Sequence, residues 1–78
     1  MPHAVPSKQK VQKELGKRIK AIREAKGISQ KDFESFDNSI HRGDLSVIES
    51  GQSMPNVYTL FKIAAILEVD VADFFKKG

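Results

Sequence analysis

The sequence contains no cysteine, so neither a disulfide bond nor a cysteine-ligated zinc ion can brace its fold. With 78 residues it is expected to form one small domain, below the length at which a single hydrophobic core gives generous stability. Packing between helices or a partner subunit must therefore hold it together. The lack of cysteine is also compatible with a reducing cytoplasm, without establishing it.

Long apolar runs are also absent. No stretch approaches the ~18 residues of a membrane span, and the first residues lack the apolar segment of a secretory signal. There is no His-Glu-x-x-His motif, no glycine-rich phosphate loop and no serine or cysteine in a nucleophile motif. We therefore expect a soluble, cytoplasmic protein that is not an enzyme, with no cofactor, metal, membrane contact or evident small-molecule substrate.

Positive charge is concentrated at the start of the chain. Residues 1–26 hold eight Lys and Arg side chains against two Glu, a net charge of +6, whereas residues 27–78 carry a net charge of −3. A basic end on an otherwise acidic body suits a polyanionic partner, although many small domains carry basic helices without one. Charge alone leaves these two interpretations equally open.

Apolar spacing predicts an all-α fold, a small bundle of five short helices around one core. Residues 1–6 contain two prolines and are expected to form a flexible tail, which leaves residues 7–78 as the domain. The first helix is basic; Ser7 can cap its start and Gly27 its end. Its apolar residues recur at steps of three and four: Val11, Leu15, Ile19 and Ile22.

Two helices are predicted near the end of the chain. Asn56 caps the first of them, and because Phe61 makes it apolar beyond one stripe, we expect this helix to be buried from more than one side. Asp70 caps the short last helix. Its Phe74 and Phe75 are candidates for a dimer interface, or alternatively close the core. The inner face of the longer helix is expected to carry Leu60, Ile63, Ala64 and Leu67.

The middle of the chain has the pattern of two short helices joined by a polar turn. Ser29 and Asp32 form a capping box at the first helix, and Phe33 and Phe36 are expected on one of its faces. Residues 37–39 (Asp-Asn-Ser) favour a turn, because Asp and Asn hydrogen-bond to their own backbone.

The second of these helices has its inner face marked by Ile40, Leu45 and Ile48, and Gly51 supplies its stop. Two short helices joined in this way are the plan of a helix-turn-helix. The second helix of such a motif can enter the major groove of DNA.

Several motifs follow one another in a fixed order between residues 15 and 75. They are Leu15-Gly16-x-x-Ile19-x-x-Ile22-Arg23, Ile28-Ser29-Gln30, Phe33, Leu45-Ser46-x-Ile48-Glu49-x-Gly51 and Pro55-Asn56-x-x-Thr59-Leu60. In this order they resemble the lambda-repressor-like (Cro/CI, Xre-type) helix-turn-helix family. The resemblance implies a transcriptional regulator of the repressor type that binds an operator in double-stranded DNA through the major groove, as a homodimer.

The resemblance also implies which residues read bases. Arg42 and Gly43 are placed near the start of the recognition helix, where an arginine can hold guanine O6 and N7 with two hydrogen bonds. Val47, with Ser46 beside it, is placed to touch a thymine methyl group. The alternative for Arg42 is a solvated side chain at a helix start, which the helix dipole disfavours.

Contacts to phosphate are expected on both sides of the recognition helix. Ser29 and Gln30 stand at a helix N-terminus, whose free N–H groups and dipole favour an anion. His41 precedes the recognition helix, and Ser50 and Gln52 follow it. The alternative is that these five residues are ordinary polar surface positions.

Arg23 and Glu49 are expected to form a structural ion pair, as the resemblance implies. The first helix would then set the angle at which the recognition helix is presented. The alternative is two unrelated surface charges.

The sequence departs from the family pattern in ways that favour a second hypothesis. One extra residue stands between Gln30 and Glu49, Glu34 replaces the usual small residue, and Asp44 places a negative charge near the expected DNA. A protein-interaction module, such as an antitoxin or a regulatory subunit with weak or no DNA reading, is therefore the alternative function.

Lysines at the start of the first helix have no place in the family pattern. Lys8, Lys10 and Lys13 are either a solvated face or an arm that lies along DNA phosphates.

Overall fold

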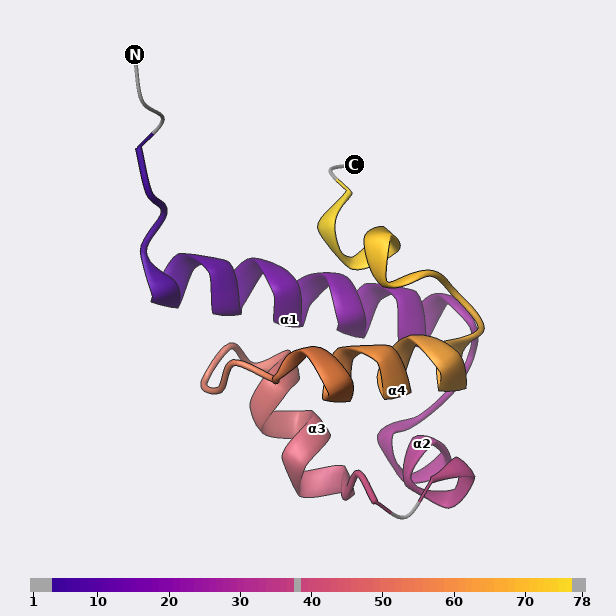
Figure 1. The fold of residues 1–78 in the computed structure, drawn as a ribbon. Helices are drawn as coiled ribbons and strands as arrows, with labels where there is room; N and C mark the ends of the chain where they lie inside the picture. The colour runs from indigo at the N-terminus through magenta and orange to yellow at the C-terminus, as the bar shows by residue number, and fades with distance from the viewer. Residues whose placement is uncertain (1–3, 38, 77–78) are drawn as a thin grey trace.

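The computed structural model describes residues 4–37 and 39–76, which form helical segments packed around one core (Figure 1). These segments are α1 (Lys8–Ala25), α2 (Gln30–Phe36), α3 (Arg42–Glu49), α4 (Val57–Leu67) and the 3₁₀ helix η1 (Val71–Phe75). The predicted all-α fold is confirmed, and the last of the five segments is a 3₁₀ helix. Residues 1–3 of the expected tail lie outside the described residues, and residues 4–7 have no regular secondary structure.

Polar side chains determine where three of the segments begin. Ser7 Oγ accepts the backbone N–H three residues on at 3.1 Å, and Asn56 Oδ1 does the same in α4 at 2.7 Å. At η1, the Asp73 carboxylate accepts the backbone N–H of Asp70 at 3.1 Å. Each of the bonds in α1 and α4 satisfies a donor that the helix leaves without an internal partner. The predicted starts of these segments are confirmed.

Glycines end α1 and α3. Gly27 and Gly51 have φ values of +71° and +80°, in the left-handed region that costs other residues more than glycine. At the end of α3, Gln52 N–H donates to Val47 O at 3.0 Å and Gly51 N–H donates to Ile48 O at 3.1 Å. These are the two bonds of a Schellman motif, so the chain turns sharply after the predicted stop.

The core joins all five segments. The predicted inner face of α4 is buried, as are Leu45 and Ile48 of α3 and Phe33 of α2. On the predicted face of α1, Leu15 and Ile19 are buried, whereas Val11 and Ile22 are partly buried. Phe36, however, is 63% exposed, so of the two phenylalanines predicted on one face of α2 only Phe33 enters the core. The reason is that α2 ends at Phe36 and the chain continues in an extended conformation at Asp37. The largest fully buried side chains are Phe33, Ile19, Leu45, Ile63 and Leu67.

α4 carries apolar side chains on its outer face as well. Val57, Tyr58 and Phe61 are 68%, 71% and 57% exposed. The prediction that this helix is buried from more than one side is therefore wrong for a single copy of the chain. Phe74 of η1 closes the core at 2% exposure, whereas Phe75 is 58% exposed.

Candidate nucleic-acid interface

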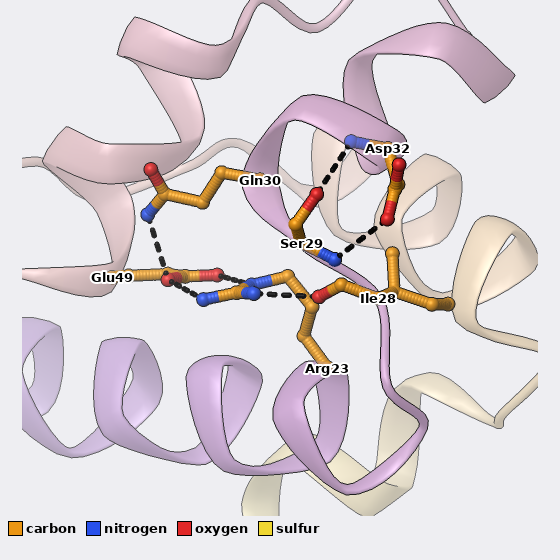
Figure 2. A network of polar contacts seen from close by, with 6 residues as sticks. All are labelled: Arg23, Ile28, Ser29, Gln30, Asp32 and Glu49. Atoms are coloured by element: carbon orange, nitrogen blue, oxygen red, sulfur yellow. Dashed lines mark hydrogen bonds and ion pairs between the residues drawn. The ribbon is translucent and has the colours of Figure 1, made fainter.

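α2 and α3 are joined as a helix-turn-helix, and the local hydrogen bonds explain why. Ser29 Oγ accepts Asp32 N–H at 2.9 Å, while the Asp32 carboxylate accepts Ser29 N–H at 3.2 Å (Figure 2). This capping box was predicted and is confirmed. In the turn, Asp37 Oδ1 accepts Ser39 N–H at 2.9 Å, which lowers the pKa of Asp37. Asn38, also assigned to the turn, lies outside the described residues.

The burial of α3 on one side leaves its other side free. Leu45 and Ile48 are buried as predicted, at 0% and 6% exposure. Ile40 is also buried, at 3% exposure, but it lies in the turn because α3 begins only at Arg42, so its predicted place on the helix is wrong. The four candidate base-reading residues all lie on the exposed part of the helix, and the structure brings them together there. They are Arg42, Gly43, Ser46 and Val47.

The position of Asp44 bears on the hypothesis that this chain lost DNA reading. Asp44 lines the groove between α3 and α4, together with Lys62. Val47 lines the same groove and stands about 60° from Asp44 around an ideal helix, whereas Arg42 and Ser46 stand about 160° from it. The Asp44 carboxylate therefore lies at the edge of the face that carries the candidate base-reading residues, on the side of Val47.

Glu34 holds the start of α3. The backbone N–H of Arg42 donates to Glu34 Oε2 at 2.8 Å, and His41 Nδ1 lies 3.6 Å from the same oxygen. The hydrogen bond from Arg42 lowers the pKa of Glu34, and the charge of Arg42 and the proximity of His41 add to this effect. His41 precedes the helix but makes no side-chain cap bond. Sequence reasoning missed this role, because the cap comes from a residue eight positions upstream.

A buried hydrogen-bonded pair joins α1 to the end of α3. Arg23 Nε donates to Glu49 Oε2 at 2.7 Å and Arg23 Nη2 donates to Glu49 Oε1 at 2.9 Å (Figure 2). Arg23 Nη1 also donates to the carbonyl oxygen of Ile28 at 2.6 Å. The hydrogen bond to Glu49 raises the pKa of Arg23, so the guanidinium stays charged. The ion pair that the resemblance implies is present in the structure.

Gln30 adds the start of α2 to the same network. Its Nε2 donates to Glu49 Oε1 at 3.0 Å, so its side chain lies against the ion pair (Figure 2). One amide hydrogen is thereby used within the protein, while the second can still donate to a phosphate. The Ser29 hydroxyl oxygen is likewise engaged in the helix cap and retains its own O–H donor.

The turn after α3 is braced by α1. Gln12 Nε2 donates to the carbonyl oxygen of Gly51 at 3.0 Å, a contact that sequence reasoning did not identify. Ser50 Oγ donates to Val47 O at 3.0 Å, and Ser50 and Gln52 are both exposed. These two candidate phosphate contacts therefore lie on a turn of defined shape.

Gly16 allows α1 to lie directly against the end of α3. A Cβ atom at this position would overlap the carbonyl oxygens of Ile48 and Glu49. The close approach brings Arg23 and Gln12 to the same end of α3, so α1 supports that end at three places. The spacing of apolar residues gave no sign of this contact.

Other kinds of site are not found in the described residues. No group of three or more His, Cys, Asp or Glu side chains there could hold a metal ion. Within the same ranges, no helix combines the length and the apolar composition that crossing a membrane requires.

Comparison with known proteins identifies both a family and a fold. The family model described as a helix-turn-helix domain matches residues 16–77. Among solved structures, the restriction-modification controller protein C.AhdI from Aeromonas hydrophila superposes with a TM-score of 0.82 and is 24% identical, covering 90% of this chain and 100% of its own. At this identity the likeness shows the fold. No curated protein sequence matches the chain.

Proposed function

The chain belongs to the helix-turn-helix domain family, and on that premise we propose that it is a sequence-specific DNA-binding transcriptional regulator. The observation that carries this proposal is the exposed face of α3, with Arg42 in its first turn. An α-helix presented in this way fits the major groove, where side chains can read base edges. The fold shared with a restriction-modification controller protein adds support for a regulatory role.

In this proposal the recognition helix α3 reads the base sequence, and residues on either side of it position the helix on the DNA. Arg42 takes a guanine and Val47 a thymine methyl group, with Gly43 and Ser46 allowing close approach. Phosphate contacts on both sides of the recognition helix fix its position along the DNA, and these contacts do not read the base sequence. The residues proposed to hold phosphates are Ser29, Gln30, His41, Ser50 and Gln52.

We also propose that the chain acts as a homodimer through the outer face of α4. One module of this kind buries little DNA surface, whereas a twofold dimer reads two half-sites one helical turn apart. Tyr58 and Phe61 are more than half exposed, and Phe36 lines the same groove as Tyr58. An exposed apolar surface of this kind on a small protein marks an interaction site.

The size of this face suits a second copy. The exposed aromatic side chains are Phe36, Tyr58 and Phe61, at 57–71% exposure. Together they present on the order of 400 Å² of surface per copy, and so roughly 800 Å² in a dimer. With its polar rim, such a contact reaches the ~1,200 Å² of a specific interface. Lys62 and Glu68 border the groove with opposite charges. In a twofold dimer, Lys62 of each copy can therefore face Glu68 of its partner.

A gel shift with the DNA upstream of its own gene tests DNA binding. We expect a discrete complex whose affinity falls steeply as salt rises, because phosphate contacts release counterions. No binding even at low salt would overturn the proposal. A flat salt response beside tight binding to another protein would favour the alternative, a protein-interaction module on the same fold.

Sedimentation of matched variants tests the dimer. Phe61→Lys should sediment as a monomer, because a twofold contact would bring two charges into an apolar interface. Phe75→Lys serves as the control, since Phe75 is exposed to a similar extent but belongs to η1. Equal behaviour of the two variants, whether both dimeric or both monomeric, would contradict the α4 interface.

A further inference from the structure

Four lysines form one stripe along α1. Lys10, Lys13, Lys17 and Lys20 follow one another at spacings of three, four and three, and all four are exposed. At 100° of rotation per residue they lie within an arc of about 80°. At 1.5 Å per residue the stripe is about 15 Å long. We call this set the lysine stripe.

Within residues 4–37 and 39–76, no lysine of the stripe forms an ion pair. The ion pairs of the described residues are Arg23–Glu49, His41–Glu34 and Lys76–Asp73, none of which involves the stripe. Glu14 lines the groove between α1 and η1 and borders one edge of the stripe, four residues after Lys10 and three before Lys17. Four positive charges thus share one solvated surface, with Glu24 one turn beyond its last lysine.

The lysine stripe lies beside the recognition helix. A Cβ on Gly51 would stand 2.8 Å from Lys13 Cγ, so the Lys13 side chain rests on the turn after α3. At the other end, Lys20 lies one turn before Arg23, which holds Glu49 and approaches the start of α2 (Figure 2). Gly16, between these points, presses on the end of α3. The stripe therefore runs from one proposed phosphate site towards the other.

We propose that the lysine stripe binds the sugar-phosphate backbone of the same DNA, beside the segment that α3 reads. Successive phosphates of one strand rise by about 3.4 Å along the duplex, so 15 Å spans about four of them. Such contacts add affinity without sequence preference. This inference rests on the proposed function and extends the DNA-binding surface beyond the helix-turn-helix.

The test compares two double variants that lose the same charge. Lys17→Gln/Lys20→Gln removes two stripe lysines, and glutamine keeps nearly the same helix propensity. Lys26→Gln/Lys76→Gln is the control, because both of these lysines lie near Asp73, beside the C-terminal end of α1 and outside the lysine stripe. Circular dichroism confirms folding, and fluorescence anisotropy measures binding to specific and random duplex DNA between 50 and about 300 mM salt.

The stripe variant should lower the slope of log affinity against log salt by up to about 1.8, since each lost phosphate contact removes about 0.9. The loss should be the same on specific and random DNA, and the control should keep the slope of the unaltered protein. Equal slopes for the two variants, or a loss confined to the specific duplex, would overturn the inference while leaving the proposed function intact. If the unaltered protein bound no duplex at all, the proposed function itself would fail.

Discussion

Arg23 and Glu49 stand 26 residues apart in the chain and meet through two hydrogen bonds, at 2.7 and 2.9 Å, with both residues 6% exposed. The remaining guanidinium nitrogen and the carboxylate are also engaged, by Ile28 and Gln30. Bidentate charge-assisted bonds of this kind are directional. The pair therefore fixes how α3 is held relative to α1 and to the start of α2.

Removing one partner of this pair should be costly. Glu49→Ala leaves the Arg23 guanidinium buried without its carboxylate, and we expect it to lower the free energy of unfolding by about 3–5 kcal/mol. Urea denaturation measures this change. Glu24→Ala is the control on the exposed side of α1, and its effect should stay within about 0.5 kcal/mol. Similar small effects for both variants would show that the pair is energetically unimportant.

Two glycines in helices should respond to alanine in opposite directions. Gly43 has open space where a Cβ would stand, so Gly43→Ala should stabilise the protein by up to about 1 kcal/mol through helix propensity. Gly16→Ala should destabilise it despite the same gain, because the new Cβ would overlap backbone carbonyl oxygens of α3. Thermal unfolding of the two variants measures both signs. Stabilisation by Gly16→Ala would mean that α1 and α3 do not touch as described.

The cap that Glu34 provides should depend on pH. The N–H of Arg42 favours the charged carboxylate, so the pKa of Glu34 is lower in the folded protein than its ordinary value of 4.5. A lowered pKa gives stability that is present above 4.5 and is lost as pH falls through the folded value. The difference in unfolding free energy between the unaltered protein and Glu34→Gln should therefore shrink below pH 4.5. A constant difference between pH 3 and about 6 would contradict this cap.

Local chemistry made much of the fold predictable. Ser29, Asn56 and Gly51 mark helix ends through bonds to backbone groups within a few residues, so spacing alone reveals them. The cap from Glu34 to Arg42 and the contact of Gly16 with α3 depend on how distant segments meet. No local pattern encodes such contacts.

The outer face of α4 shows a different limit of sequence reasoning. The apolar character of Phe61 favours burial, but a sequence pattern does not say whether its own chain or a partner covers it. In the single chain, Phe61 is 57% exposed. The same ambiguity applies to Phe36 at the end of α2.

Arg42→Ala tests most directly whether α3 reads bases. Binding constants of the unaltered protein and the variant are measured at one salt concentration on its operator and on random duplex DNA. If Arg42 holds a guanine, the variant should lose about 1–3 kcal/mol of binding free energy on the operator and much less on random DNA. It should also tolerate substitution of one particular base pair. An equal loss on both duplexes would show that Arg42 contacts only phosphate, and would contradict the assignment of this face of α3 to base reading.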